Sequence, residues 1–389
     1  MRLAVLSLVV GCSYTPPNAA TDSSPGDGAE TDAAPVDAPT DAWLTGWSHR
    51  KSITIDHTKV TAPDLGLRDF PVAILLPADP EIAAVARSDG ADLVVTGADA
   101  TTKLPIELER YASGEIALWV QVEALKADAD TRLYLYYGNN SPPSVTPELV
   151  WTNQFLAVWH LNQTPAAGNA GDIKDATANN HDGEPDDSMS DNDLFQNGFV
   201  GPAIRFDGGN EFIDIPSTIT LGDQFTISAW VFHQGGTNGI KTVFSNSLSG
   251  LNVSGCRLFV NSDNSQDRRI IFETSNGTAN ASASTNANQM PVQIWTHVAV
   301  QVDRAAGAAK IYVDGVDRTI SGTVRNDFAN TTSSSEIARM GDLFTWIGRL
   351  DEIELASELR SEAWIKTAFS NQGKPAEFFD VGVQELDPN

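Results

Sequence analysis

Short runs that alternate apolar and polar residues recur along the chain from Trp43 onward. The runs before residue 140 are rich in β-branched and aromatic residues, and Gly, Pro and Asp turns separate them. A hydrophobic period of two indicates β-strands with one buried face. The runs read KSITID, FPVAILL, ADLVVTG, LPIELER, IALWVQV and TRLYLYY. We therefore expect a β-sandwich over residues 43–148, with one short helix at DPEIAAVAR that Asp79 caps.

A second, longer series of strand-like runs follows the turn-forming segment YYGNNSPPSVTPE. It extends from FLAVWHL through FTISAWVFH and WTHVAVQVD to GRLDEIELA, with almost no helical period. Many short strands at this spacing predict a large β-sandwich over residues 149–389. One helix is expected at SEAWIKTAFSN, with Ser361 as its N-cap. The predicted fold class is all-β, with two β-sandwich domains.

The chain begins with MRLAVLSLVVGCSYTPP, in which one Arg precedes an apolar run that ends before Cys12. This start resembles a bacterial lipoprotein signal over residues 1–11, which implies lipidation of Cys12. An ordinary secretory signal with an incidental cysteine is the alternative. Residues 12–42 are rich in Pro and Asp and predict a disordered acidic tether. We expect an exported lipoprotein, anchored to a membrane and facing the cell surface or the periplasm.

Composition narrows the range of partners. The chain has 389 residues, 41% of them hydrophobic, which is enough for two cores, and its formal net charge is −26. Such an acidic surface repels phosphate and argues against nucleic acid as a partner. Cys256 is the only cysteine besides Cys12 and lies in the strand-like run CRLFV. We interpret it as a buried core thiol rather than a nucleophile.

Both halves resemble known families. The motifs VWHLN, DATANNHDG, IRFDG, FTISAWV, WTHVAVQVD, KIYVDG and WIGRLDEIEL follow the order of laminin-G-like domains of the concanavalin A-like lectin/glucanase superfamily. The resemblance implies a jelly roll of two antiparallel sheets that binds a carbohydrate or a cell-surface protein without cleaving it. The first half, from GWSHRKSITI to LYLYYGN, is similar to a bacterial surface domain of unknown function. A structural surface protein with no ligand is a further alternative.

The segment RLDEIEL raises the question of catalysis, because the superfamily includes glucanases. Laminarinase-type members carry Glu-x-Asp-x-Glu on one strand, whereas here Leu350 replaces the first glutamate. Strand period predicts that Leu350, Glu352 and Glu354 share one face and that Asp351 lies on the other. The two glutamates would then lie about 6 to 7 Å apart, between the retaining and the inverting separations. A divergent glycoside hydrolase that uses Glu352 and Glu354 is therefore the alternative to a non-catalytic binder.

Calcium and an aromatic platform are the remaining candidate features. Loops at one rim of such domains supply oxygen ligands, and the candidates here are Asp175, Asn180, Asp207 and Asp351. The alternative is that these residues only form turns. For a bound glycan, the loops FHQGGTNGIK and GDLFTWIG are the candidate positions, with Phe344 or Trp346 as the stacking platform. The alternative for Trp346 is burial, because it matches an aromatic position of the closing strand in the family that the chain resembles. His160 and His297 lie in strand-like runs and are interpreted as packed core residues. The chain contains no H-E-x-x-H, G-x-S-x-G or Walker A motif.

Overall fold

A computed structural model of the chain gives the fold. It describes residues 42–62, 66–165, 169, 171–236, 239–247, 253–262, 265–332, 334–341 and 344–388. The proposed signal, Cys12 and the tether up to residue 41 lie outside the described residues, so export and lipid anchoring stay predictions. In the part of the chain that is described, no helix has the length and apolar character needed to cross a membrane.

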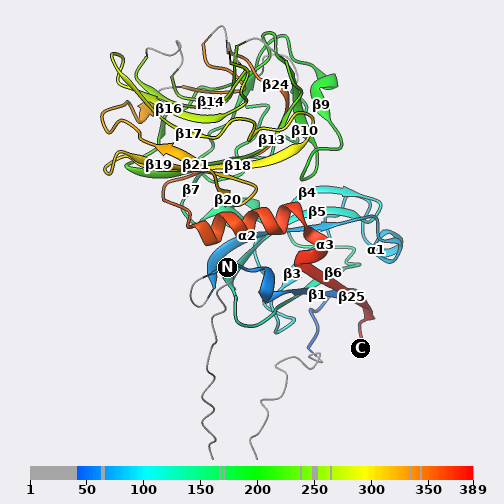
Figure 1. Cartoon of the computed structure of the whole chain (residues 1–389). Helices are drawn as coiled ribbons and strands as arrows, with labels where there is room; N and C mark the ends of the chain where they lie inside the picture. The colour runs from blue at the N-terminus through cyan, green and yellow to red at the C-terminus, as the bar shows by residue number, and fades with distance from the viewer. Residues whose placement is uncertain are drawn as a thin grey trace, which may run out of the picture. The chain divides into compact units, whose positions relative to one another are not determined.

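Two small sheets form the first β-sandwich (Figure 1). One sheet has the order β25 (Phe379–Leu386), β1 (His49–Ile55), β6 (Thr131–Tyr137) and β3 (Val94–Thr96). The other has the order β2 (Leu67–Leu76), β5 (Glu115–Leu125) and β4 (Ile106–Ala112). The short helix α1 (Pro80–Val85) confirms the predicted helix, because the Asp79 side chain accepts hydrogen bonds from the N–H groups of Glu81 and Ile82. A 3-10 turn, η1 (His57–Lys59), follows β1.

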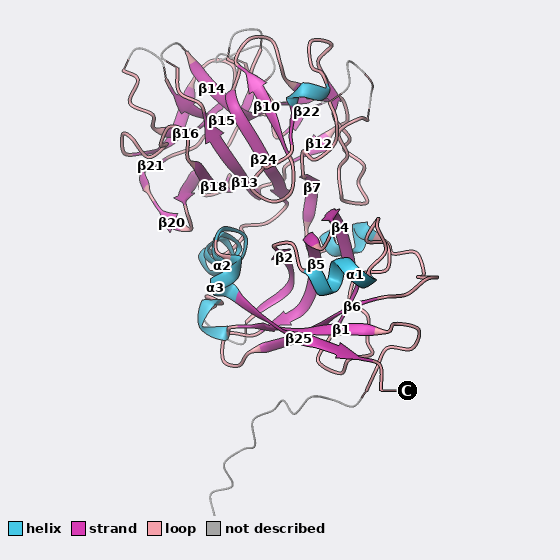
Figure 2. Cartoon of the chain, turned by 90° about the vertical axis from the view of Figure 1, so that its right-hand side faces the viewer, coloured by secondary structure: helices cyan, strands magenta, loops and turns pink. Residues whose placement is uncertain are grey.

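The jelly roll consists of two larger sheets that face each other (Figure 2). The first, called the β24 sheet, has the order β20 (Val316–Asp317), β19 (Ala308–Val313), β18 (Trp295–Asp303), β13 (Gln224–His233), β24 (Ile347–Ala356), β10 (Ala203–Asp207) and β9 (Leu194–Phe195), with β7 (Phe155–Trp159) also beside β24. The second has the order β21 (Thr319–Gly322), β17 (Asn280–Thr285), β16 (Ile270–Ser275), β15 (Gly255–Asn261), β14 (Ile240–Ser245), β23 (Ser335–Ile337), β11 (Ile213–Ile215) and β8 (Glu184–Pro185). A small sheet pairs β12 (Ile219–Thr220) with β22 (Thr331–Thr332), and the remaining 3-10 turns are η2 (Pro147–Trp151) and η3 (Asp191–Asp193).

The core of the jelly roll is continuous between its two large sheets and is built from alternate residues of their strands. Cys256 lies in this core as a fully buried free thiol, which confirms its interpretation. His297 is also buried, as predicted. The all-β prediction is confirmed, since the described residues are mostly strands with few helices.

The end of the chain returns to the first sandwich. Helix α2 (Glu362–Gly373), capped by Ser361 as predicted, leads through α3 (Pro375–Phe378) into β25, which pairs antiparallel with β1. We assigned the whole of residues 149–389 to the second domain, but the structure places this last strand in the sheet of the first. Strand period identifies a strand and does not identify its sheet, which is the reason for the difference.

Candidate functional site

Strand β24 carries the RLDEIEL segment and contains a β-bulge. Opposite it on β13, Trp230 pairs with Asp351 and Ser228 pairs with Glu354, so β24 has one residue more than its partner over this stretch. Glu352 lies within the bulge and has a left-handed backbone, with φ of 50°. An extra residue changes the face to which every later side chain points.

The bulge overturns the prediction that Leu350, Glu352 and Glu354 lie on one face of the strand. The apolar side chains of β24 point into the core of the jelly roll: Leu350, Ile353 and Leu355. Asp351, Glu352 and Glu354 instead make their contacts outside that core, so Leu350 and the two glutamates do not share a face. The prediction was wrong because a period of two assumes a strand without bulges.

His160, directly after β7, connects β24 to the first sandwich. Its Nδ1 atom lies 2.9 Å from both carboxylate oxygens of Glu352, and its Nε2 atom lies 3.2 Å from Oε2 of Glu107 on β4. The ring packs beside the indole rings of Trp119 and Trp151, with centroid distances of 5.8 and 5.4 Å. His160 is buried as predicted, but it is also the centre of a polar network.

Two tryptophans hold the carboxylates of β4 in place. The Nε1–H group of Trp151 donates to Glu107 at 2.5 Å, and that of Trp119 donates to Oε2 of Glu109 at 3.0 Å. The same oxygen of Glu109 lies 3.9 Å from Nδ1 of His160. We call the whole set the carboxylate–histidine cluster: Glu107, Glu109, His160, Asp351, Glu352 and Glu354.

Burial and neighbouring charges shift the pKa values in this cluster in opposite directions. Burial lowers the pKa of His160, but Glu352 and Glu107 outweigh it and hold that pKa well above its usual value. Burial, followed by repulsion from Glu352, raises the pKa of Glu109 and of Asp351 well above the usual range. Burial also acts to raise the pKa of Glu107, yet the charge and hydrogen bond of His160 lower it overall. Glu109 and Asp351 therefore resist ionisation, whereas His160 and Glu107 favour their charged forms.

The predicted catalytic alternative gains no support from this geometry. Glu352 is only 2% exposed, and both of its oxygens contact His160. Glu354 accepts a hydrogen bond from Oγ of Ser228 at 3.2 Å. A glycosidase needs its two carboxyl groups on either side of an accessible sugar linkage. Glu352 and Glu354 do not offer such an opening.

Glu354 gives a pH dependence that can be tested. Burial, aided by the charge of Glu352, raises the pKa of Glu354 to about 7, whereas an unfolded glutamate has a pKa of about 4.3. The folded chain thus retains a proton that the unfolded chain loses in this window, so stability falls as the pH rises from about 4 to about 7. Glu354→Gln should remove the part of this fall that Glu354 causes and stabilise the chain by up to about 3 kcal/mol at about pH 8, with little change at about pH 4. Urea unfolding at both pH values measures the difference.

Glu362→Gln, at an exposed position in the first turn of α2, is the matched control. It should leave the pH dependence of stability as it is in the unchanged chain. If the curves for Glu354→Gln and the unchanged chain ran parallel from acid to alkaline pH, the buried proton on Glu354 would be excluded.

The residues predicted to bind calcium come from three segments of the jelly roll, with Asp175 and Asn180 in the same loop. Asp175 accepts hydrogen bonds from the N–H groups of Val158, Thr177 and His181, so it organises its own loop. Asn180 lies exposed in that loop. Asp207 bonds to the N–H group of Gly209, and Asp351 bonds to those of Phe199 and Val200. Among the described residues, the groupings of acidic, His or Cys side chains close enough to hold a metal include none of these aspartates.

Trp346 cannot serve as a stacking platform for a sugar. Its ring is 0% exposed and contacts the ring of His233 inside the jelly roll, with the centroids 5.6 Å apart. Phe344, two residues before it, is half-buried. The prediction for Trp346 is therefore corrected, because the aromatic residue at this position belongs to the core.

A polar hollow of about 420 Å³, which we call the acidic cleft, lies at the β8 edge of the jelly roll. Its charged lining residues are Glu184, Asp186, Asp187, Asp214, Glu336 and Arg339. The guanidinium of Arg339 bonds to Oε1 of Glu336 and lies 3.1 Å from the ring centroid of Phe212, so it is held from two sides. Sequence reasoning missed this cleft, because its residues come from three segments that only the fold brings together.

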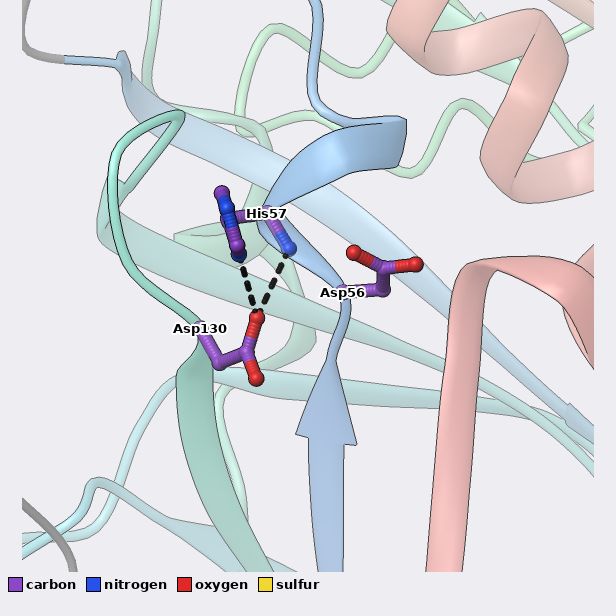
Figure 3. A group of neighbouring side chains, drawn as sticks. All are labelled: Asp56, His57 and Asp130. Carbon is purple, nitrogen blue, oxygen red and sulfur yellow. Dashed lines mark hydrogen bonds and ion pairs between the residues drawn. The ribbon is translucent and has the colours of Figure 1, made fainter. Parts of the chain in front are cut away.

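The first sandwich carries an exposed group of another kind (Figure 3). Nδ1 of His57 and Oδ1 of Asp130 are 2.7 Å apart. Asp56 points away from this pair and, as the N-cap of η1, accepts a hydrogen bond from the N–H group of Thr58. His57 and Asp130 have side chains that are 38% and 48% exposed. Water competes for the hydrogen bonds of all three side chains. They therefore serve below as the exposed control for the buried carboxylate–histidine cluster.

Two family models match parts of the chain. Residues 207–366 match the concanavalin A-like lectin/glucanases superfamily, and residues 89–150 match a domain of unknown function (DUF2341). Both resemblances are confirmed: the chain carries a concanavalin A-like domain and, before it, the domain of unknown function. Comparison with curated proteins gave no match.

Several solved structures are similar to part of the chain. The binding domain of botulinum neurotoxin serotype G is 13% identical over 56% of this chain and 51% of that chain, with a TM-score of 0.39. A second structure is domain 4 of AbnA, a GH43 extracellular arabinanase from Geobacillus stearothermophilus, in complex with arabinotriose. It is 19% identical over 56% of this chain and 98% of that chain, with a TM-score of 0.40. The chain spans about half the length of the neurotoxin domains that it matches. At these TM-scores the likenesses carry no argument about function.

Proposed function

We propose that this protein binds neutral carbohydrate in the acidic cleft of its concanavalin A-like domain and does not cleave it. The observation that carries the proposal is the cleft itself, which combines several hydrogen-bonding side chains with a volume suited to a small ligand. Ligand sites in proteins commonly enclose about 300 to 1,000 Å³ and fix the ligand through a few placed polar groups.

The chemistry of the cleft suits hydroxyl groups. Ionised carboxylates accept hydrogen bonds only, and each can accept from two neighbouring hydroxyls of a sugar ring. Glu184 lies on the edge strand β8, and Asp187, three residues later, is exposed. Arg339 supplies donors from a guanidinium whose position Glu336 and Phe212 fix. A rigid donor beside several acceptors supports recognition of a polyhydroxylated ligand.

The charge of the cleft indicates which sugars it accepts. Five carboxylates and one guanidinium line it, in a chain whose net charge is −26. Anionic sugars would meet like charge and lose affinity, whereas neutral sugars would not. Calcium remains a prediction from the sequence, and the same cleft can be tested in its presence and absence. Recognition of a surface protein is the alternative partner.

A glycan array with the purified chain tests the proposal, with and without calcium. Neutral glycans should give the signals and anionic glycans should not. Asp187→Ala and Glu184→Ala should each weaken binding about tenfold, the effect of losing one hydrogen bond to a charged group. Asp191→Ala is the matched control, because Asp191 is an exposed carboxylate of η3 that does not line the cleft. A blank array, or equal binding by all variants, would remove the cleft as the site. Release of reducing sugar from a bound glycan would contradict the absence of cleavage.

A further inference from the structure

We infer that Glu109, His160 and Glu352 form a binding site for a divalent transition metal ion between the two β-sandwiches. These residues offer one ligand atom each, and the three atoms lie within 4.8 Å of one another. Glu109 comes from β4 of the first sandwich, His160 follows β7, and Glu352 lies in the bulge of β24. The site is distinct from the acidic cleft and does not depend on the proposed carbohydrate binding.

The neighbours of these three residues resemble the outer shell of a metal site. A histidine that binds a metal through one ring nitrogen usually donates its other N–H group to a carboxylate, which fixes the ring. Nε2 of His160 lies 3.2 Å from Glu107 and would make this hydrogen bond. Nδ1, which faces Glu352, is then the ring nitrogen that would bind the metal. Trp151 in turn holds Glu107, and Trp119 holds Glu109. The ligands are therefore oriented before any ion arrives.

An unsatisfied oxygen points independently to a cation. The side chain of Glu109 is 0% exposed, and its Oε1 atom has no hydrogen-bond partner. Asp351, adjacent to Glu352 and also 0% exposed, leaves its Oδ1 atom without a partner. A buried polar oxygen without a partner is costly, so such atoms are normally hydrogen-bonded or bound to a metal ion. One cation would satisfy Glu109 and offset the repulsion within the cluster.

The donor set indicates the class of metal. Two carboxylates and one imidazole suit Zn²⁺ or Mn²⁺, whereas Ca²⁺ prefers oxygen ligands alone and more of them. Binding requires a neutral imidazole, so the Nδ1 proton of His160 leaves to solvent as the metal binds. The remaining ring proton stays on Nε2 of His160, which donates a hydrogen bond to Glu107.

A cleft lies close to Glu109, on the other side of Gly201. The backbone of Gly201 lies so close to Oε1 of Glu109 that a side chain at this position would overlap that oxygen. Gly201 also lines a cleft of about 520 Å³, together with Phe199, Arg110 and Glu115. Glu109 itself does not line this cleft, and the backbone of Gly201 separates the two. Because the ligands come from both sandwiches, the ion would join them.

Metal analysis of the purified full chain tests the inference. The chain is stripped with a chelator, offered ZnCl₂, MnCl₂ or CaCl₂, desalted, and its metal content is measured. We expect one Zn²⁺ or Mn²⁺ per chain and a higher melting temperature with the metal. Glu109→Gln should weaken binding at least about 100-fold, and Glu107→Gln, which acts only through His160, about 10- to 100-fold. Co²⁺ should give a visible absorption spectrum that Glu109→Gln abolishes.

Asp130→Asn is the matched control, because Asp130 contacts His57 in the exposed group and lies in the first sandwich. It should leave the metal content and the Co²⁺ spectrum unchanged. The inference fails if the unchanged chain retains none of the three metals and melts at the same temperature with and without them. It also fails if Ca²⁺ alone is retained, or if Asp130→Asn loses the metal while Glu109→Gln keeps it. The measurement on the unchanged chain decides the question even if a variant does not fold.

Discussion

Replacing His160 with Leu should lower the free energy of unfolding by about 3 to 5 kcal/mol, the usual cost of removing one partner from a buried ion pair. His160 is the only cationic group in contact with both Glu107 and Glu352 among the described residues. Its loss leaves the carboxylate of Glu352, which is 2% exposed, without its cationic partner. Urea unfolding followed by tryptophan fluorescence measures the change, since Trp119 and Trp151 pack against the imidazole.

His57→Leu is the matched control. His57 contacts Asp130 at 2.7 Å, but both side chains are more than one third exposed. Removing an exposed pair of this kind should cost only about 0 to 1 kcal/mol. If His160→Leu and His57→Leu lowered the free energy of unfolding equally, burial would not determine how much these ion pairs stabilise the chain.

A double variant separates the ion pair from simple packing. His160→Leu with Glu352→Leu removes the unpaired carboxylate together with its partner, and buried pairs can often be replaced by apolar residues at little cost. The double variant should therefore be more stable than His160→Leu alone, with a coupling energy of about 0.5 to 3 kcal/mol. If the two losses simply added, the interaction between His160 and Glu352 would not be the cause.

The fold was largely predictable from the sequence because its local signals agree with one another. Strand runs with a period of two became the two sandwiches, and the capped segments at Asp79 and Ser361 became α1 and α2. The N-caps were readable because Asp and Ser side chains accept hydrogen bonds from the first N–H groups of a helix. These signals act over a few residues and need no knowledge of the tertiary fold.

The candidate site was not predictable for the opposite reason. The bulge at Glu352 adds one residue to β24, and a second register shift lies between Leu108 and Arg110 in β4, next to Glu109. A bulge changes which face a side chain occupies without leaving a clear trace in the hydrophobic pattern. The two carboxylates in LPIELER were a signal, since Glu107 and Glu109 recur at a spacing of two. Their meeting with His160 follows only from the contact between the sandwiches.

Deleting residues 379–389, which removes β25, should destabilise the first sandwich by more than about 4 kcal/mol, beyond the range of most single substitutions. The deletion exposes β1 as an edge strand and removes Phe379, which is buried in the first core. It also removes Glu385, whose carboxylate lies 2.7 Å from the buried guanidinium of Arg50. Thermal unfolding and limited proteolysis measure the loss, with cleavage expected before residue 150.

Val383→Thr is the control for the deletion, because it changes an exposed side chain of β25 and keeps the strand. Val383 is 81% exposed, and threonine has a comparable preference for strands, so this variant should change stability by less than about 0.5 kcal/mol. The jelly roll has its own core, so its fragment should resist protease in the truncated chain. If the truncated chain melted and resisted protease like the full one, β25 would be a dispensable edge strand, and a first domain ending at residue 148 would be complete. If it failed as expected, the first sandwich would depend on both ends of the described chain, and the jelly roll would be an insertion between its strands.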